Sequence, residues 1–175
     1  MFEWFTANGD HIFWSDITNT IAYVVRHDPE HHIVVGSDSQ PSRDKTLFVV
    51  AICIVSNVPQ KERTYYYGKH SAHNISNLYT RVFQEADGAT QVALALKDSH
   101  LILEQEMNLS IHLDLSPPEK TSTTSKYSKG LTAFVKSCGF LNVETKPDSW
   151  ASSSIADRYT KNDNSRNCKQ LKKTN

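Results

Sequence analysis

The chain has 175 residues, of which 38% are hydrophobic and 22% charged, and this composition predicts one globular domain with a real core. Its 19 Lys and Arg residues balance 19 Asp and Glu residues, which argues against a strongly basic nucleic-acid-binding surface. No apolar run is long enough to span a membrane, and Met1 to Trp4 show no secretory signal. The three cysteines have no close spacing, so we expect a cytoplasmic protein without a disulfide framework.

Residues 1–32 are expected to form an N-terminal extension that packs on the main domain. Within it, apolar side chains at helical spacing predict a short helix from Ile17 to His27, with Asp16 as its N-terminal cap. The Asp28-Pro29 pair would end this helix, because the residue before a proline disfavours helical backbone.

Three β-rich runs follow, at residues 33–38, 46–56 and 62–67. The short turns between them predict an antiparallel meander. A long helical pattern then includes Leu78 and continues to Leu96. Asp98-Ser99 would break this pattern before a further stretch at residues 101–106.

The second half of the chain alternates strands and helices. A fourth strand is expected at residues 110–115, a helix at 127–138 ended by Gly139, a fifth strand at 140–145, and a last helix over 151–160 capped by Asp148 or Ser149. The order β-β-β-α-β-α-β-α predicts an α/β domain over residues 33–161, with a mixed five-stranded sheet and helices on both faces. Residues 162–175 are expected to form a polar, basic tail.

Four carboxylates occupy positions where burial is expected. Asp38 ends the first apolar strand, and Glu85 lies beside the apolar stripe of the long helix. Asp114 interrupts the fourth strand, and Asp157 lies in the Ser- and Ala-rich last helix. A buried carboxylate is costly unless it is paired or binds a metal ion. Four of them on four separate elements therefore suggest one metal site assembled by the fold.

Each carboxylate also has a simpler interpretation. Asp38 and Asp114 could cap the turns that follow their strands. Glu85 could pair with Arg81, and Asp157 with Lys161, each four residues away on the same helix face. The metal-site hypothesis therefore depends on the four residues taken together.

Three short motifs carry a resemblance to a known family. They are Gly36-Ser37-Asp38-Ser39-Gln40, His112-Leu113-Asp114, and Lys146-Pro147-Asp148-Ser149-Trp150-Ala151. In their order and placement they resemble the RNase H-like superfamily of nucleases, and more narrowly the bacterial YkuK-type family of RNase H-like proteins. The similarity extends from about Ile33 to Lys161 and implies an RNase H-like fold.

The resemblance also implies a mechanism and a partner. It implies hydrolysis of phosphodiester bonds in RNA, an RNA–DNA hybrid or structured DNA, with two Mg²⁺ or Mn²⁺ ions held by carboxylates. Asp38 would bridge both ions, Asp157 would complete the site of the ion that activates the nucleophile, and Glu85 and Asp114 would hold the other. His112 or Lys161 would contact phosphate or assist proton transfer.

Two alternatives stay open at this point. The chain could be a nucleic-acid-binding or regulatory module that has the fold without the chemistry, in which case the run Tyr65–Tyr67 could stack on bases. It could also be a zinc hydrolase that uses some of its eight histidines, among them His31, His32, His70 and His73. The sequence contains no His-Glu-x-x-His motif, which argues against the second alternative.

Overall fold

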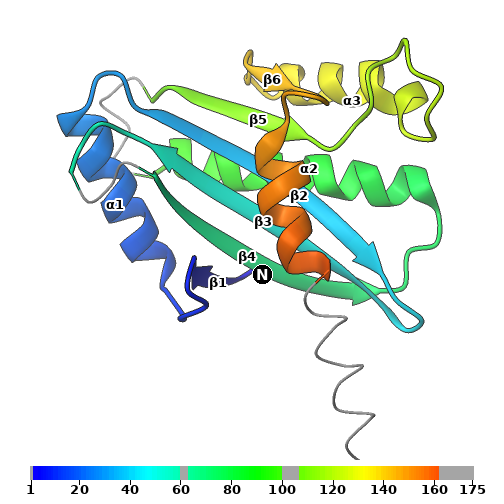
Figure 1. Cartoon of the computed structure of the whole chain (residues 1–175), viewed down its shortest axis with the longest axis horizontal. Helices are drawn as coiled ribbons and strands as arrows, with labels where there is room; N and C mark the ends of the chain where they lie inside the picture. The colour runs from blue at the N-terminus through cyan, green and yellow to red at the C-terminus, as the bar shows by residue number, and fades with distance from the viewer. Residues whose placement is uncertain (1, 60–62, 100–106, 162–175) are drawn as a thin grey trace, which may run out of the picture.

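The computed structural model describes residues 2–59, 63–99 and 107–161. In these ranges the chain forms a mixed sheet covered by helices on both faces (Figure 1). The expected stretch at 101–106 and the expected tail from residue 162 lie outside the described residues. No helix of the described ranges has both the length and the apolar character needed to cross a membrane.

The predicted antiparallel meander is confirmed. It consists of β2 (His32–Pro41), β3 (Lys45–Val55) and β4 (Arg63–His73). β5 (Leu109–Leu113) adds parallel to β2, and the two-residue strand β6 (Val143–Glu144) adds parallel to β5. The parallel pairing places the carboxyl ends of β2 and β5 at the same end of the sheet, where ligands gather in α/β folds.

Within the described residues the sheet has six strands, one more than the five expected. The additional strand is β1 (Glu3–Thr6), which comes from the N-terminal extension and pairs antiparallel with β4, giving the order β1-β4-β3-β2-β5-β6. The extension is therefore continuous with the sheet, and it also carries α1 (Trp14–His27). Asp16 lies in the first turn of α1, and the cap position belongs to Phe13, so the expected cap at Asp16 is wrong.

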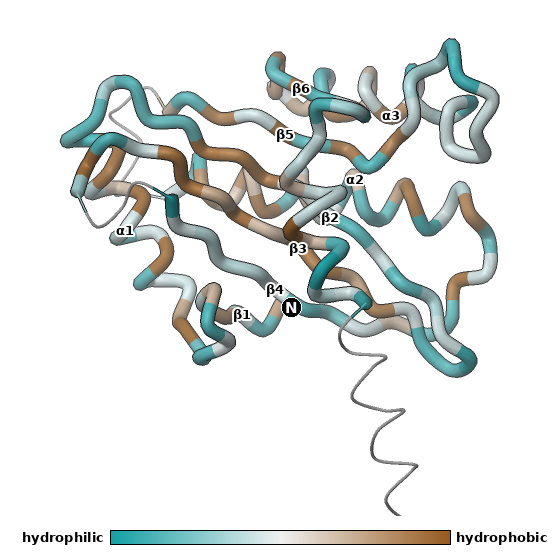
Figure 2. Tube along the Cα trace, viewed as in Figure 1, coloured by the Kyte–Doolittle hydropathy of each residue, from teal (hydrophilic) through white to brown (hydrophobic). Residues whose placement is uncertain are grey.

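One face of the sheet is covered by α1, α2 (Leu78–Lys97) and α3 (Ser125–Ser137). Apolar residues of α1 and α2 pack there on Ile33, Val35 and Ile52 of the central strands, which appear as brown tube in Figure 2. The Asn77 side chain caps α2 by accepting a hydrogen bond from the Thr80 amide at 3.0 Å. Gly139 follows α3 with φ +92°, which confirms its expected role at the end of that helix.

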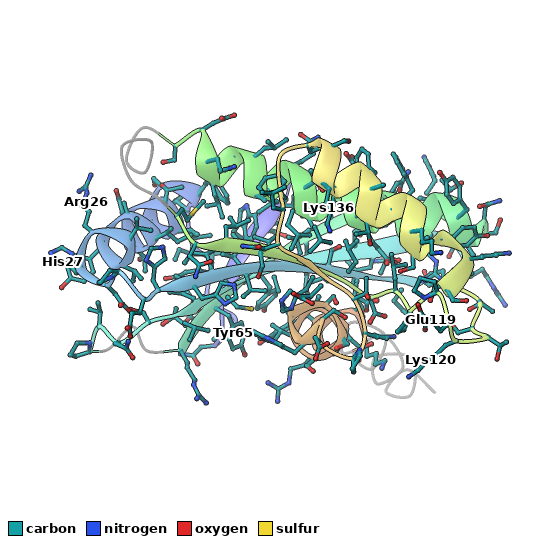
Figure 3. The ribbon with its side chains drawn as sticks, turned by 90° about the horizontal axis from the view of Figure 1, so that it is seen from above. Arg26, His27, Tyr65, Glu119, Lys120 and Lys136 are labelled. Atoms are coloured by element: carbon teal, nitrogen blue, oxygen red, sulfur yellow. The ribbon has the colours of Figure 1, made fainter. Side chains whose placement is uncertain are left out.

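Of the described residues, one helical segment covers the opposite face, as the view from above in Figure 3 shows. It includes the π-helix η1 (Ala151–Ala156), and the helix continues to Lys161. Small residues make this contact: Ala151 and Ala156 pack against Val34, Val49 and Ala51. Because these side chains are short, the helix lies close to the sheet and its later turns reach the carboxyl end of β2.

Candidate active site

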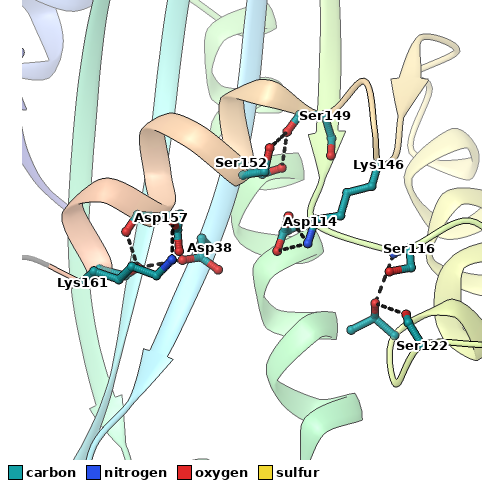
Figure 4. A network of polar contacts seen from close by, with 12 residues as sticks. Asp38, Asp114, Ser116, Ser122, Lys146, Ser149, Ser152, Asp157 and Lys161 are labelled. Atoms are coloured by element: carbon teal, nitrogen blue, oxygen red, sulfur yellow. Dashed lines mark hydrogen bonds and ion pairs between the residues drawn. The ribbon is translucent and has the colours of Figure 1, made fainter.

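Asp38 and Asp114 are neighbours just beyond the last parallel pair of β2 and β5: Asp114 follows the end of β5, and Asp38 precedes the last three residues of β2. The last registered pair between β2 and β5 is Ser37 with Leu113, so the next position brings Asp38 beside Asp114. Paired residues of parallel strands present their side chains on the same face, and here that is the face covered by η1. Both carboxylates are partly buried (Figure 4).

Close packing of η1 on β2 brings the third aspartate to the same place. The helix crosses the strand at Gly36, where an added Cβ would lie 2.6 Å from the amide nitrogen of Ser152. About two turns later, Thr160 Oγ1 donates a hydrogen bond of 2.7 Å to Asp38 Oδ2 and also contacts the Asp157 carbonyl oxygen at 2.9 Å. Figure 4 shows Asp157 beside Asp38.

Glu85 approaches from the other face of the sheet. It lies on α2 with only 7% of its surface exposed, and Ser39 Oγ donates a hydrogen bond to its Oε1. Ser37 Oγ donates to the Glu85 backbone carbonyl at 2.6 Å, so two alternate residues of β2 fix this helix turn. Arg81 Nη1 donates to the Ser39 carbonyl at 3.2 Å, and its charge opposes the rise in the Glu85 pKa, so Arg81, the alternative partner of Glu85, acts on it without a direct hydrogen bond.

The four carboxylates act on one another electrostatically. Burial raises the pKa of Asp38 to about 6, the Thr160 hydrogen bond opposes this rise, and the charges of Asp114 and Asp157 add to it. Burial likewise raises the pKa of Glu85 to about 8, against the Ser39 hydrogen bond, and the nearby charges of Asp38 and Asp114 raise it further. The fold therefore concentrates negative charge at one end of β2.

Two lysines partly neutralise this charge. Lys146 Nζ lies 2.9 Å from Asp114 Oδ1 and 3.1 Å from Oδ2, and only the second contact has hydrogen-bond geometry. Lys161 Nζ lies 2.7 Å from Asp157 Oδ2, which is the helical pair expected as the simpler interpretation of Asp157. In the arrangement described, no three His, Cys, Asp or Glu side chains of residues 2–59, 63–99 and 107–161 form a group that could hold a metal ion.

His112 has a different position from the one expected for a phosphate contact or proton transfer. Its side chain is 2% exposed, and its Nδ1 accepts a hydrogen bond of 3.3 Å from the Ala151 amide at the start of η1. The Trp150 ring lies edge-on to it, with ring centroids 5.3 Å apart. Burial lowers the pKa of His112 to about 4, so the ring is neutral near pH 7. In this arrangement His112 orients η1.

The histidines proposed as zinc ligands have separate structural partners. His31 Nδ1 bonds the Asp28 carbonyl at 2.6 Å, and its Nε2 accepts from the Asn108 amide at 3.1 Å. His32 Nε2 contacts Ser110 Oγ at 2.8 Å. His70 and His73 are exposed on β4. These contacts favour structural roles and give no support to the zinc alternative.

The tyrosine run on β4 is part of the packing against the last helix. The rings of Tyr67 and Tyr159 stack with centroids 3.7 Å apart, and Tyr65 Oη contacts Tyr159 Oη at 2.9 Å. Tyr66 is buried in the core on the opposite face. The run therefore holds the helix that bears Asp157, and its ring faces are used within the protein.

Sequence reasoning missed three polar groups of the site. They are Lys146 on Asp114, Thr160 on Asp38 and Ser39 on Glu85. Lys146 begins one of the three motifs that carry the family resemblance, and this was its only signal in the sequence. Thr160 and Ser39 are common polar residues whose partners lie 122 and 46 positions away in the chain.

A family model described as Ribonuclease H-like matches residues 16–161, which is most of the chain. The chain belongs to the ribonuclease H-like family. No curated protein matches it. Among solved structures, it is similar to Ciona intestinalis endonuclease V in complex with a 24mer DNA that contains an inosine followed by a ribo-adenosine. The identity is 13% and the TM-score 0.29, with 71% of this chain covered and 66% of the endonuclease, just under two thirds of its length.

The family match spans all four carboxylates predicted for the site. The match includes β2, α2, β5 and the last helix, which carry Asp38, Glu85, Asp114 and Asp157. It confirms the mixed α/β fold and the family that the three motifs indicated. At the level of function, the family assignment indicates a nuclease-type or nucleic-acid-binding fold.

Proposed function

We propose that this ribonuclease H-like protein is a metal-dependent nuclease that hydrolyses phosphodiester bonds of RNA, an RNA–DNA hybrid or structured DNA. The observation that supports this most strongly is the position of Asp38. Its carboxylate lies next to Asp114 in the parallel register and feels the charges of both Asp114 and Asp157. Three carboxylates from separate elements on one sheet face are a costly arrangement, and a bound cation would offset the cost.

The donor chemistry at this site suits hard divalent cations, but the carboxylates would have to move closer together than they lie here to hold one. Asp38, Asp114 and Asp157 offer carboxylate oxygens, which Mg²⁺ and Mn²⁺ prefer, and Asp114 Oδ1 is a buried oxygen whose 2.9 Å contact with Lys146 lacks hydrogen-bond geometry. Asp38 would be shared between two ions, Asp157 would belong to one, and Asp114 with Glu85 to the other. When bound, such ions activate a water molecule and stabilise the leaving oxygen of an in-line displacement.

The protein's own groups would orient these carboxylates. Thr160 Oγ1 holds Oδ2 of Asp38, and the Ser39 backbone N–H also stabilises this carboxylate. Glu85 is engaged by Ser39 on the opposite face, so its participation requires exchange of that hydrogen bond. Lys161, whose side chain is 66% exposed, lies at the open side of the site, where a phosphate of the substrate could reach its ammonium group.

A nuclease assay tests this proposal. Purified protein should cut at least one member of a panel of single-stranded RNA, RNA–DNA hybrid and branched DNA in Mn²⁺ or Mg²⁺, and not in EDTA. Asp38→Asn should abolish cutting, whereas Asp16→Asn, an exposed change on α1, should retain it. Equal cutting by wild type and Asp38→Asn would contradict the proposal.

A second candidate function is supported by the lysine contacts. Asp114 and Asp157 are both paired with lysines, so these two carboxylates are already partly neutralised without a metal ion, which a module that binds nucleic acid without cleaving it would tolerate. Nucleic-acid binding that is equally tight in EDTA and in Mn²⁺, without cleavage, would favour this function. Binding that strengthens with Mn²⁺ would favour the nuclease.

A further inference from the structure

Lys146 contacts the carboxylate that one of the expected cations would use. Its Nζ lies between both oxygens of Asp114, at 2.9 and 3.1 Å. The Asp114 side chain is 22% exposed and that of Lys146 is 41% exposed, so the pair lies at the edge of the buried region. Both carboxylate oxygens are therefore already engaged by a positive charge.

Backbone hydrogen bonds on either side of Lys146 fix its position beside Asp114. The Lys146 amide donates to the Leu115 carbonyl at 3.0 Å, and this bond joins the loop before η1 to the end of β5. Asp148 then donates its amide to the Thr145 carbonyl at 2.9 Å, which closes the turn. The side chain thus starts from a fixed point beside Asp114. By contrast, Lys161 contacts one oxygen of Asp157 from the next turn of the same exposed helix.

We propose that Lys146 is a positioning residue that competes with divalent cations for Asp114. This inference rests on the proposed metal site. The ammonium group holds the carboxylate in place and balances its charge while no cation is bound. A cation that enters must displace the ammonium from at least one oxygen, because the two positive charges repel each other at contact distance. The exposed stem lets Lys146 withdraw toward solvent without disturbing the fold.

The competition has a measurable consequence for metal affinity. Lys146→Met removes the ammonium and keeps an apolar side chain of similar reach, so Mn²⁺ should bind more tightly than to wild type. The expected gain is about two- to fivefold, the range that corresponds to partly exposed ion pairs. Lys146→Arg keeps a competing cation that can contact both oxygens, so its Mn²⁺ affinity should equal that of wild type or be weaker.

The test is a calorimetric titration of Mn²⁺ into each protein without nucleic acid. Lys136→Met is the matched control, because it removes one exposed positive charge from α3, on the face of the sheet opposite η1 (Figure 3). Its affinity should equal that of wild type. A thermal melt checks the fold of each variant, and Lys146→Gln replaces Lys146→Met if the latter does not fold.

Two unfavourable outcomes can be told apart. If wild type binds Mn²⁺ and Lys146→Met binds it no more tightly, or if Lys136→Met shows the same gain, the inference about Lys146 is wrong and the metal site stands. If neither wild type nor Lys146→Met binds Mn²⁺, the proposed metal-dependent function fails, and the inference fails with it.

Discussion

The Cα of Gly36 in β2 lies directly against the backbone of Ser152 in η1. A Cβ at this position would be 2.6 Å from the Ser152 nitrogen and 2.8 Å from the Ala151 carbonyl carbon, which is closer than non-bonded atoms can approach. The glycine therefore sets the distance between the last helix and the sheet. This distance determines whether Thr160 can bond Asp38 and whether Asp157 lies beside Asp38.

Gly36→Ala should push η1 away from β2 and destabilise the protein. The obstructing atoms belong to backbone, which cannot rotate aside, so the free energy of unfolding should fall by about 1–3 kcal/mol. Urea unfolding measures the change. Gly130→Ala in α3 is the control, because nothing lies within 4 Å of its added Cβ, and alanine there should stabilise by about 0.5–1 kcal/mol. Equal stability of the two variants would contradict the close contact.

Glu85 should make the stability of the metal-free protein depend on pH. Its pKa is raised to about 8 in the folded state by burial, while an unfolded glutamate titrates near 4.5. Below the lower value both states are protonated and there is no penalty. As pH rises between the two values the unfolded state loses its proton first, so stability falls, and the loss is complete above the folded pKa.

Glu85→Gln should remove this pH dependence. Relative to wild type, the variant should gain a few kcal/mol of stability between pH 5 and pH 9, since each pKa unit corresponds to about 1.4 kcal/mol. Chemical unfolding at the two pH values, in EDTA, measures the gain. Glu119→Gln, in an exposed loop, is the matched control. Parallel pH profiles for wild type and Glu85→Gln would show that the glutamate is not held in a charge-disfavouring environment.

Asp38→Asn should have opposite effects on stability without and with metal. The asparagine keeps the Thr160 hydrogen bond through its carbonyl oxygen and removes a charge that burial and two aspartates disfavour. At pH 8 in EDTA the variant should therefore be more stable than wild type by about 1–3 kcal/mol.

Addition of Mn²⁺ should reverse this order. A cation that binds only the folded wild type adds about 2.7 kcal/mol at a hundredfold excess over its Kd, and Asp38→Asn should lose most of that gain. Thermal unfolding with and without Mn²⁺ measures both effects. If wild type and Asp38→Asn responded equally to Mn²⁺, the ion would be bound elsewhere.

The strands and helices that carry the four carboxylates could be predicted because local pattern determines them. Asp38 follows an apolar run that pairs on both sides, and Glu85 has the helix phase expected of a buried residue. The strand β1 could not be predicted, since four residues give little periodic signal and its partners in β4 are 60 to 66 positions away.

The hydrogen bonds of the site could not be predicted from the sequence, because they also join residues that are far apart in the chain. Hydrogen bonds such as Thr160 to Asp38 and Lys146 to Asp114 join residues that only the folded backbone brings together. The burial of His112 could not be predicted from the sequence either. The sequence placed it on the strand face of Asp114, but its burial beneath η1 depends on how closely that helix approaches.

Diffraction from crystals soaked in Mn²⁺ tests the central claim most directly, because the anomalous signal locates the ion without any assay of activity. We expect a peak within about 2.5 Å of carboxylate oxygens of Asp38 and of Asp114 or Asp157, with Lys146 withdrawn from Asp114. A fully soaked crystal with no anomalous peak at Asp38 would contradict a metal site at the carboxyl ends of β2 and β5.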